Sequence, residues 1–313
     1  MSDGLAAVLV EAFSEGPGAG NGAAVVRLSG PASSRWMQAV AGSLRQAETA
    51  FLLAEGDRWL LRWFTPSCEV PLCGHATLAA VLALGYWGQL LPGQELALQT
   101  RSGALAVGLI RSPRRGGAGR GWIALPGGGL AAAAVPGDLD ALLRRRGLDG
   151  VEAFWRSPLG YAVALVSAWS PLERLHELAG ELAGDLRSGL VVMQPCPNAA
   201  QAGEPPRLWG DPADYQLRFF APGLGIPEDA VTGSAHALVA PWWMQQLGRA
   251  RVVGWQCSDR PGGMVCEALS SATIRLTGSG HLLWDGTLFA GPETCAADSS
   301  ALEAWRELAS AEF

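Results

Sequence analysis

Three side chains that could take part in acid–base or nucleophilic chemistry stand together at a predicted helix start. Cys73, His75 and Thr77 surround Gly74 in the segment CGHAT, and an apolar, helix-forming run follows over residues 78–87. The first turn of a helix has unpaired backbone N–H groups and a partial positive charge, and glycine lets a ligand approach them. This stretch therefore predicts an anion site beside a thiol and an imidazole.

The elements before this helix must position it and could add a carboxylate. Residues 47–64 predict a hairpin of two apolar strands that turns at residues 55–57, and Pro66 ends the second strand by removing a backbone donor. Glu48 stands at the junction between a predicted helix and the first strand, where a side chain can project from the end of a sheet toward a cleft. The alternative is an ordinary surface acid near a helix end.

Composition favours a small-molecule protein. The chain has 313 residues, 49% of them hydrophobic, and a net charge of −6, which is enough apolar material for two packed domains. All 23 basic residues are Arg, so Schiff-base chemistry through lysine is excluded. The longest basic cluster is Arg144 to Arg146, so neither nucleic acid nor a membrane surface is expected as a partner.

Cysteine and histidine spacing predicts no metal site. The six cysteines form no C-x-x-C pair and the four histidines are scattered. The N-terminus lacks the basic start of a secretion signal, so we expect a cytoplasmic protein with free thiols.

The remaining patterns organise the chain into two domains and a tail. Strands are expected at 5–12 and 23–29, joined by the loop GPGAGNG, which fits a tight connection better than a phosphate cradle. A helix is expected over 170–183, with His176 on its surface. The loop-forming segment 111–120 is the predicted linker, which gives an N-terminal domain 1–115, a C-terminal domain 116–290 and a tail 291–313. In the tail, Ser299 could cap a helix that presents Leu302, Trp305 and Leu308 on one face.

An internal repeat relates the two halves. RWFTP at 62–66 matches RFFAP at 218–222, and CGHATLA at 73–79 matches TGSAHALVA at 232–240, with three extra residues in the second copy. If the halves are similar domains, the helix starts at Gly74 and Gly233 face one ligand across a cleft. A small carboxylate would suit them, held by backbone N–H groups and by the hydroxyls of Thr232 and Ser234. The acids Glu228 and Asp229 could cap the second helix or orient His75.

At these segments the chain resembles the phenazine-biosynthesis isomerase-like (PhzF-like) proteins, which share a fold with diaminopimelate epimerase. The matching pieces are ETAFL at 48–52, residues 62–79, LQTRSGAL at 98–105 and residues 218–243. The resemblance implies an α/β (α+β) fold of two pseudo-symmetric domains, each a curved, mostly antiparallel sheet or barrel around a central helix. It also implies a homodimer, and an isomerase that moves a proton on a small carboxylate-bearing metabolite without metal or organic cofactor.

The resemblance also implies roles for individual residues. Glu48 matches the family's general acid/base, and Gly74 with His75 matches its Gly-His pair. Asp229 matches its aspartate and Ser234 its carboxylate-binding serine. The chain departs from the pattern at Cys73, where the phenazine enzymes have a small residue, and at Thr232, where the epimerases have a second catalytic cysteine.

These departures leave three hypotheses. Threonine cannot deprotonate a carbon acid near neutral pH, so a racemase with two thiols is not expected. A one-thiol epimerase that uses Cys73 remains open, although a buried structural thiol is the commoner role for such a cysteine. A protein that binds the ligand without turnover is the third hypothesis, and it has no need of Glu48 as a base.

Overall fold

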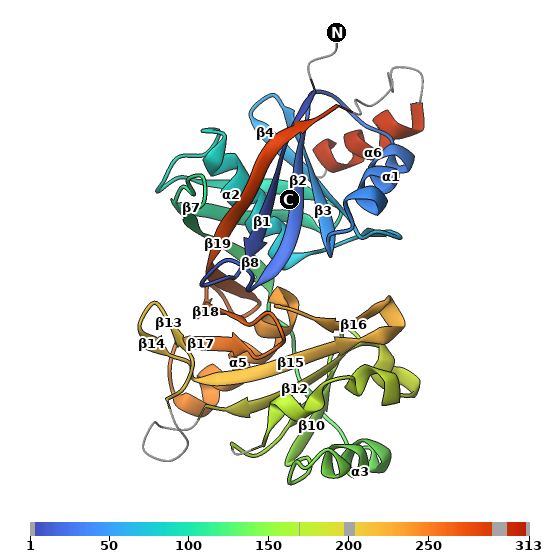
Figure 1. Cartoon of the computed structure of the whole chain (residues 1–313), viewed down its shortest axis with the longest axis vertical. Coiled ribbons are helices and arrows are strands. Elements are labelled where there is room, and N and C mark those ends of the chain that lie inside the picture. The colour runs from blue at the N-terminus through green and yellow to red at the C-terminus, as the bar shows by residue number, and fades with distance from the viewer. Residues whose placement is uncertain (1–3, 169, 197–203, 290–298, 311–313) are drawn as a thin grey trace. The chain divides into compact units, whose positions relative to one another are not determined.

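Eight strands close into a ring in the first of two units. The computed structural model describes residues 4–168, 170–196, 204–289 and 299–310, and its first unit comprises Met1–Ala124 and Thr277–Phe313. Strands pair around the ring in the order β1–β2–β3–β4–β6–β7–β8–β19, and β19 pairs back with β1 (Figure 1). Their bounds are β1 (Leu5–Ala12), β2 (Asn21–Leu28), β3 (Glu48–Glu55), β4 (Arg58–Phe64), β6 (Glu95–Thr100), β7 (Gly103–Arg111), β8 (Ala118–Pro126) and β19 (Thr273–Leu288). The pairs β2–β3 and β4–β6 are parallel.

Helix α2 (Gly74–Tyr86) is the central helix of this unit, and all of its residues except Tyr86 are buried. It is apolar on every side, as expected of a helix enclosed by a sheet. A Cβ at Gly85 would come within 2.7 Å of the Leu109 side chain, so this glycine permits close packing of the helix on β7. The short strand β5 (Glu69–Val70) pairs with β4 just before α2.

Two further helices, α1 (Ser34–Leu44) and α6 (Ser299–Ser310), pack on strands of the first unit. Trp305 and Leu308 of α6 are buried in a core that also includes Phe51 and Phe64, and the Trp305 indole donates a hydrogen bond of 2.9 Å to the carbonyl of Ala32. The C-terminal helix therefore belongs to the first unit. Residues 291–298, with Cys295, and the side chain of Leu302 lie outside the described part.

The second unit, Leu125–Leu276, repeats the strand pattern. Along the series β11, β12, β15, β17, β18, successive strands pair parallel, antiparallel, parallel and antiparallel. The series β2, β3, β4, β6, β7 of the first unit alternates in the same way. Helix α5 (Gly233–Leu247) occupies the sequence position of α2. The other elements are β9 (Ala131–Ala132), α3 (Gly137–Arg145), β10 (Ala153–Arg156), β11 (Ala162–Leu165), β12 (Leu190–Pro195), β13 (Arg207–Leu208), β14 (Asp211–Pro212), β15 (Tyr215–Ala221), β16 (Ile226–Asp229), β17 (Arg251–Gln256) and β18 (Gly262–Ala268).

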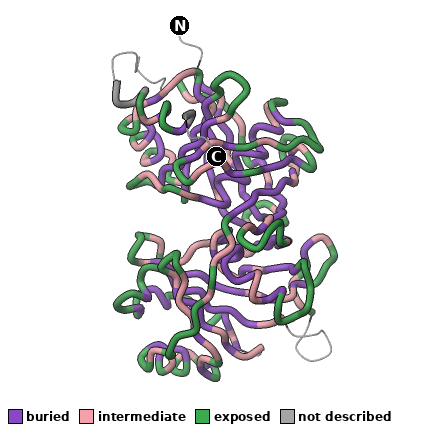
Figure 2. The backbone as a smooth tube through the Cα atoms, turned by 180° about the vertical axis from the view of Figure 1, so that it is seen from behind, coloured by how far each residue is buried: buried purple, intermediate pink, exposed green. Residues whose placement is uncertain are grey.

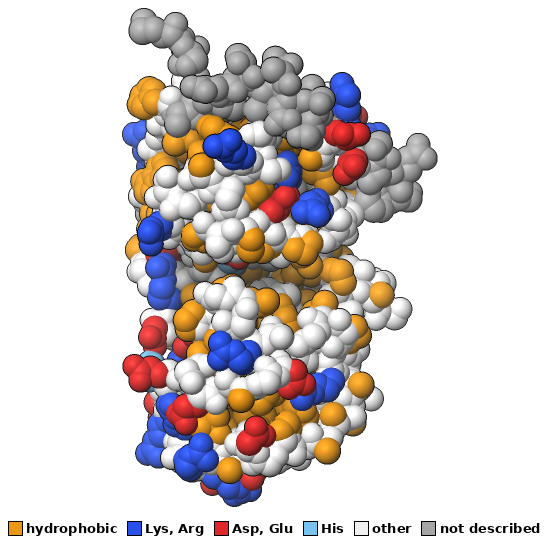
Figure 3. Space-filling view, turned by 90° about the vertical axis from the view of Figure 1, so that its right-hand side faces the viewer, with side chains coloured by type: hydrophobic (Ala, Val, Ile, Leu, Met, Phe, Trp, Pro, Cys, Tyr) orange, Lys and Arg blue, Asp and Glu red, His pale blue; other side chains and the backbone are white. Residues whose placement is uncertain are grey.

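This architecture is the one implied by the family resemblance: a mixed α/β fold of two similar units, each with a mostly antiparallel sheet around a central helix. Buried residues concentrate in the strands and central helices, and exposed ones in the turns (Figure 2). Acidic and basic side chains are interspersed over the described part of the face in Figure 3. Within the described ranges, no helix is long and apolar enough to cross a membrane.

Some boundaries differ from the expectations. The predicted linker 111–120 forms the turn between β7 and β8, because β8 continues the first unit's sheet, and the units divide at Ala124 and Leu125 instead of near 115. Residues 277–288 return to the first unit because β19 pairs with β1.

The helix predicted over 170–183 was wrong. The chain instead makes three short 3₁₀ turns, Leu172–Leu175, Leu178–Glu181 and Gly184–Ser188. Glu177 adopts a left-handed φ of 59°, which interrupts any continuous helix there. His176 is exposed, and its Nδ1 lies 3.3 Å from Oδ1 of Asp259.

Candidate active site

Glu48, Cys73 and His75 form one buried cluster in the first unit. The Glu48 Oε2 atom lies 2.9 Å from Nε2 of His75, and the Cys73 Sγ atom lies 3.6 Å from Nδ1. Glu48 is 6% exposed and His75 4%. Among the described residues, no hydrogen bond with acceptable angles reaches Oε2 of Glu48 despite the short distance. A buried carboxylate oxygen thus lacks a well-directed donor, which is costly unless a ligand supplies one.

Local structure explains how these three side chains meet. Glu48 is the first residue of β3 and pairs in register with Ala23 of β2. Cys73 is the N-cap residue of α2 with extended backbone, so the helix starts at Gly74 and presents His75 from its first turn. The Thr77 hydroxyl donates to the Cys73 carbonyl, one turn back along the helix. The start of β3 and the start of α2 therefore bring Glu48, Cys73 and His75 together.

Burial sets the protonation of this cluster. Burial, reinforced by the charge of Glu48, raises the pKa of the Cys73 thiol to about 11. Burial alone would lower the pKa of His75, but the charges of Cys73 and Glu48 outweigh it and raise that pKa well above its usual value.

The cluster also offers potential metal donors. The ligand atoms of Glu48, Cys73 and His75 lie within 4.8 Å of one another, although no metal spacing is visible in the sequence, because they come from two separate segments. A metal would have to displace the protons of the thiol and the imidazole, since only their deprotonated forms coordinate.

In the second unit, the remaining predicted residues gather at the start of α5. Gly233 is its first residue and Thr232 its N-cap residue. The Thr232 hydroxyl donates to Oδ2 of Asp229 at 2.6 Å, so the only hydroxyl proton of Thr232 is already committed. The Ser234 hydroxyl lies 3.3 Å from that of Tyr161. Ser234 and the first-turn backbone of α5 therefore form the part best suited to an anion, because a helix N-terminus carries a partial positive charge.

Glu228 has a structural role that the sequence reading did not give it. Its carboxylate accepts two hydrogen bonds from Arg218, with a distance of 2.6 Å from Nε to Oε1, and Arg218 is 1% exposed. Arg62 and Glu69 make the same bidentate pair in the first unit. Glu228 is thus the counterpart of Glu69, and the three extra residues of the second copy fall between Arg218 and Glu228.

Three residues near these clusters were missed by the sequence reading. Asn21 lies 3.1 Å from Nδ1 of His75, and Gln256 binds both the backbone N–H of Thr232 and the carbonyl of Asp229. Tyr161 is the third. The Gly-rich loop before Asn21 was a visible signal, whereas Gln256 and Tyr161 sit in ordinary strand sequences and only strand pairing brings them to α5.

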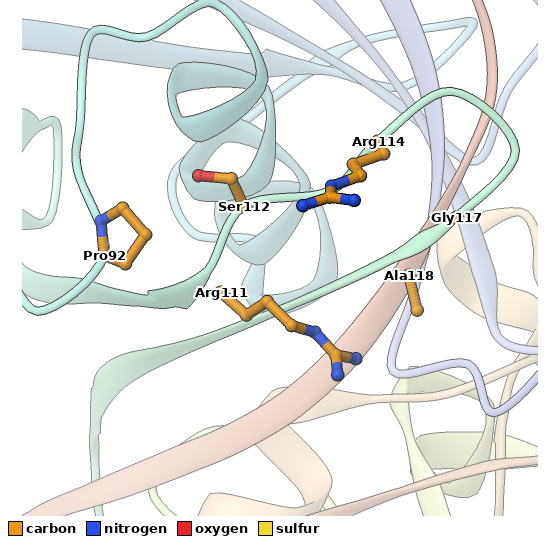
Figure 4. A pocket seen from close by; sticks show the side chains of 6 residues that line it. All are labelled: Pro92, Arg111, Ser112, Arg114, Gly117 and Ala118. Carbon is orange, nitrogen blue, oxygen red and sulfur yellow. The ribbon is translucent and has the colours of Figure 1, made fainter.

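A separate cavity of about 500 Å³ in the first unit lies beside the turn from β7 to β8 (Figure 4). Its lining includes Arg111, Ser112 and Arg114, and none of its lining residues belongs to the Glu48–His75 cluster. Arg111 and Arg114 are both exposed.

Comparison with known proteins places the chain in a family. The model described as phenazine biosynthesis-like protein (PhzC-PhzF) matches residues 10–286. An uncharacterized isomerase of Pseudomonas aeruginosa is 34% identical, covering 89% of this chain and 96% of that protein. A phenazine biosynthesis protein of the PhzF family from Enterococcus faecalis is 26% identical with a TM-score of 0.72, covering 91% and 99%. A hydroxyproline epimerase from Agrobacterium vitis, solved with trans-4-OH-L-proline, shows the same fold at 12% identity and a TM-score of 0.55, covering 91% and 90%. The chain therefore belongs to the phenazine biosynthesis-like (PhzC-PhzF) family, with named isomerases among its relatives.

Proposed function

We propose that the protein is an isomerase in which Glu48 moves a proton between carbon atoms of a small carboxylate-bearing metabolite, without metal or organic cofactor. The observation that carries the proposal is the buried Glu48 carboxylate, close to His75 but with an oxygen that lacks a well-directed hydrogen bond. Buried carboxylates beside a histidine are typical of general acid/base sites. The membership of the family and its named isomerases support the reaction class.

Each other residue has a role in this proposal. His75 positions the Glu48 carboxylate, with its Nε2 atom 2.9 Å from Oε2, and Asp229 orients the substrate's amine or hydroxyl. The substrate carboxylate binds to Ser234 and the backbone at Gly233, and the α2 start at Gly74 offers backbone N–H groups of the same kind. Thr232 and Gln256 hold Asp229 and the α5 start in place. We also propose that the enzyme is a homodimer, which sedimentation equilibrium would test.

The test is proton exchange in deuterated water. A panel of proline, trans-4-hydroxy-L-proline and cyclic amino carboxylates is incubated with enzyme, and deuterium incorporation is followed by mass spectrometry. Glu48→Gln should abolish incorporation into any active compound, while Glu55→Gln, at the exposed end of the same strand, should leave it unchanged. Exchange that persists at the wild-type rate in Glu48→Gln would remove Glu48 from the reaction, and binding without exchange in the wild type would favour a non-catalytic binding protein.

The alternative base is Cys73. Its contact with His75 favours a one-thiol epimerase, but its raised pKa leaves it protonated and so able to act only as an acid near neutral pH. Cys73→Ala separates the two mechanisms: exchange continues if Glu48 is the base and stops if Cys73 is.

A further inference from the structure

The side-chain amide of Asn21 contacts His75 on the side of the ring opposite Glu48. The amide nitrogen Nδ2 of Asn21 lies 3.1 Å from Nδ1 of His75, while Oε2 of Glu48 lies 2.9 Å from Nε2. Both Asn21 and His75 are buried, at 4% exposure each. Each nitrogen of the imidazole therefore has a neighbour from a different strand: Asn21 from β2 and Glu48 from β3. Glu48 has a role in the proposed reaction, whereas Asn21 has none so far.

The glycine-rich loop before β2 holds Asn21 in this place. Gly20 has a φ of 68°, and a Cβ there would come within 2.5 Å of the carbonyl of Ala12, the strand partner of Asn21. The buried Glu11 carboxylate accepts the N–H of Gly18 at 2.8 Å. One N–H group of the loop is thus committed to a carboxylate of its own chain. The glycines of the loop permit the tight path that delivers Asn21 to His75.

The charge of the cluster decides which end of the amide faces the ring. An amide can present either its NH₂ group or its carbonyl oxygen, since a half-turn exchanges them without changing its shape. If His75 were neutral, a Glu48 carboxylate would be a buried negative charge without a compensating positive one, which is unfavourable. If His75 is an imidazolium, the pair has no net charge. An imidazolium carries N–H on both nitrogens, so Nδ1 then needs an acceptor. The thiol of Cys73, at 3.6 Å, is a weak one.

We propose that Asn21 is a positioning residue whose side-chain carbonyl accepts the Nδ1–H of an imidazolium His75 and thereby holds the ring with Nε2 beside Glu48. Its meaning for catalysis rests on the proposed function: His75 is then a fixed hydrogen-bond donor, and the mobile proton is left to Glu48. The protonation and orientation of His75 are themselves properties of the resting protein and can be measured without a substrate.

The experiment is nitrogen NMR on protein labelled with ¹⁵N-histidine. The chain has four histidines, and the signals of His75 are assigned by their loss in His75→Gln. The wild type should show both His75 nitrogens protonated at about pH 8, above the usual range of histidine. Asn21→Leu, of similar size but without an acceptor, should lower the proton affinity of His75 by at least about tenfold. Asn21→Asp keeps an acceptor and adds charge, so it should raise that affinity.

The controls separate positioning from general damage. Gln38→Leu removes an amide that donates to the Thr65 carbonyl elsewhere in the same unit, and it should leave the His75 signals unchanged. An unprotonated Nδ1 in the wild type, or an Asn21→Leu titration equal to the wild type, overturns the proposal. If Asn21→Leu does not fold, Asn21→Asp decides, since an unchanged His75 titration there also overturns it. Proton exchange that persists in Glu48→Gln would refute the proposed function. The His75 signals of the wild type are measured without substrate, so they would still test the role of Asn21.

Discussion

His236 should make the protein sensitive to acid. It is fully buried in α5, its Nδ1 lies 2.9 Å from the Tyr215 hydroxyl, and burial lowers its pKa from 6.5 to about 3. Burial also raises the pKa of Tyr215 well above 10, so the tyrosine keeps its proton and donates to a neutral His236. The folded protein therefore leaves His236 unprotonated at a pH where the unfolded chain binds a proton.

The sign and size of the effect follow from these values. The contribution of neutral His236 is fully present above pH 6.5, the unfolded pKa, and is lost as the pH falls toward about 3. Between about pH 7.5 and about pH 4.5, the free energy of unfolding should fall by about 2.7 kcal/mol from this residue alone, at 1.36 kcal/mol per pKa unit. At pH 4.5 the protein is also below its isoelectric point of about 5.3.

The assay is urea unfolding followed by circular dichroism at both pH values. His236→Gln keeps a hydrogen-bond acceptor but does not titrate in this range, so it should lose about 2.7 kcal/mol less than the wild type between the two conditions, whatever its stability at neutral pH. Exposed His176→Gln serves as the control and should behave as the wild type. Equal losses in wild type and His236→Gln would refute the reasoning.

Three further predictions concern the clusters and the C-terminal helix. Glu228→Gln should destabilise the protein by about 3–5 kcal/mol in urea unfolding, because it leaves the buried Arg218 charge without its partner; Glu204→Gln, at an exposed pair, should have little effect, and a stable Glu228→Gln would contradict the pairing. Iodoacetamide at about pH 8 should modify exposed Cys68 and spare Cys73, whose pKa is about 11, as read by peptide mass spectrometry; rapid, ligand-protected labelling of Cys73 would instead favour the one-thiol epimerase. Trp305→Ala should lower the free energy of unfolding by about 3–5 kcal/mol in the same assay, because the indole is buried in the first unit's core. An unchanged free energy of unfolding would contradict the packing of α6 on that core.

The sequence by itself determined the repeated unit of the fold. The order of strand, proline turn, loop and glycine-led helix in 62–79 and 218–240 can be read from local propensities, because Pro66, Gly74 and the apolar runs act on their own neighbours. The strand hairpin 48–64 and the apolar character of α2 were visible for the same reason. Over 170–183 the local sequence pattern predicted a helix that does not form. The leucines there are buried, but Glu177 has a left-handed conformation that no sequence pattern indicates.

The candidate site shows where local information ends. Glu48 and His75 could be named from sequence patterns, and both lie in one buried cluster. Only the tertiary structure decided what surrounds them: Asn21 reaches His75 through the pairing of β1 with β2, and Glu228 is drawn to Arg218 by a sheet contact that short sequence motifs do not encode. It also decided that Cys73, at a helix start that by itself would favour the thiolate, keeps its proton, because burial beside a carboxylate outweighs the helix charge.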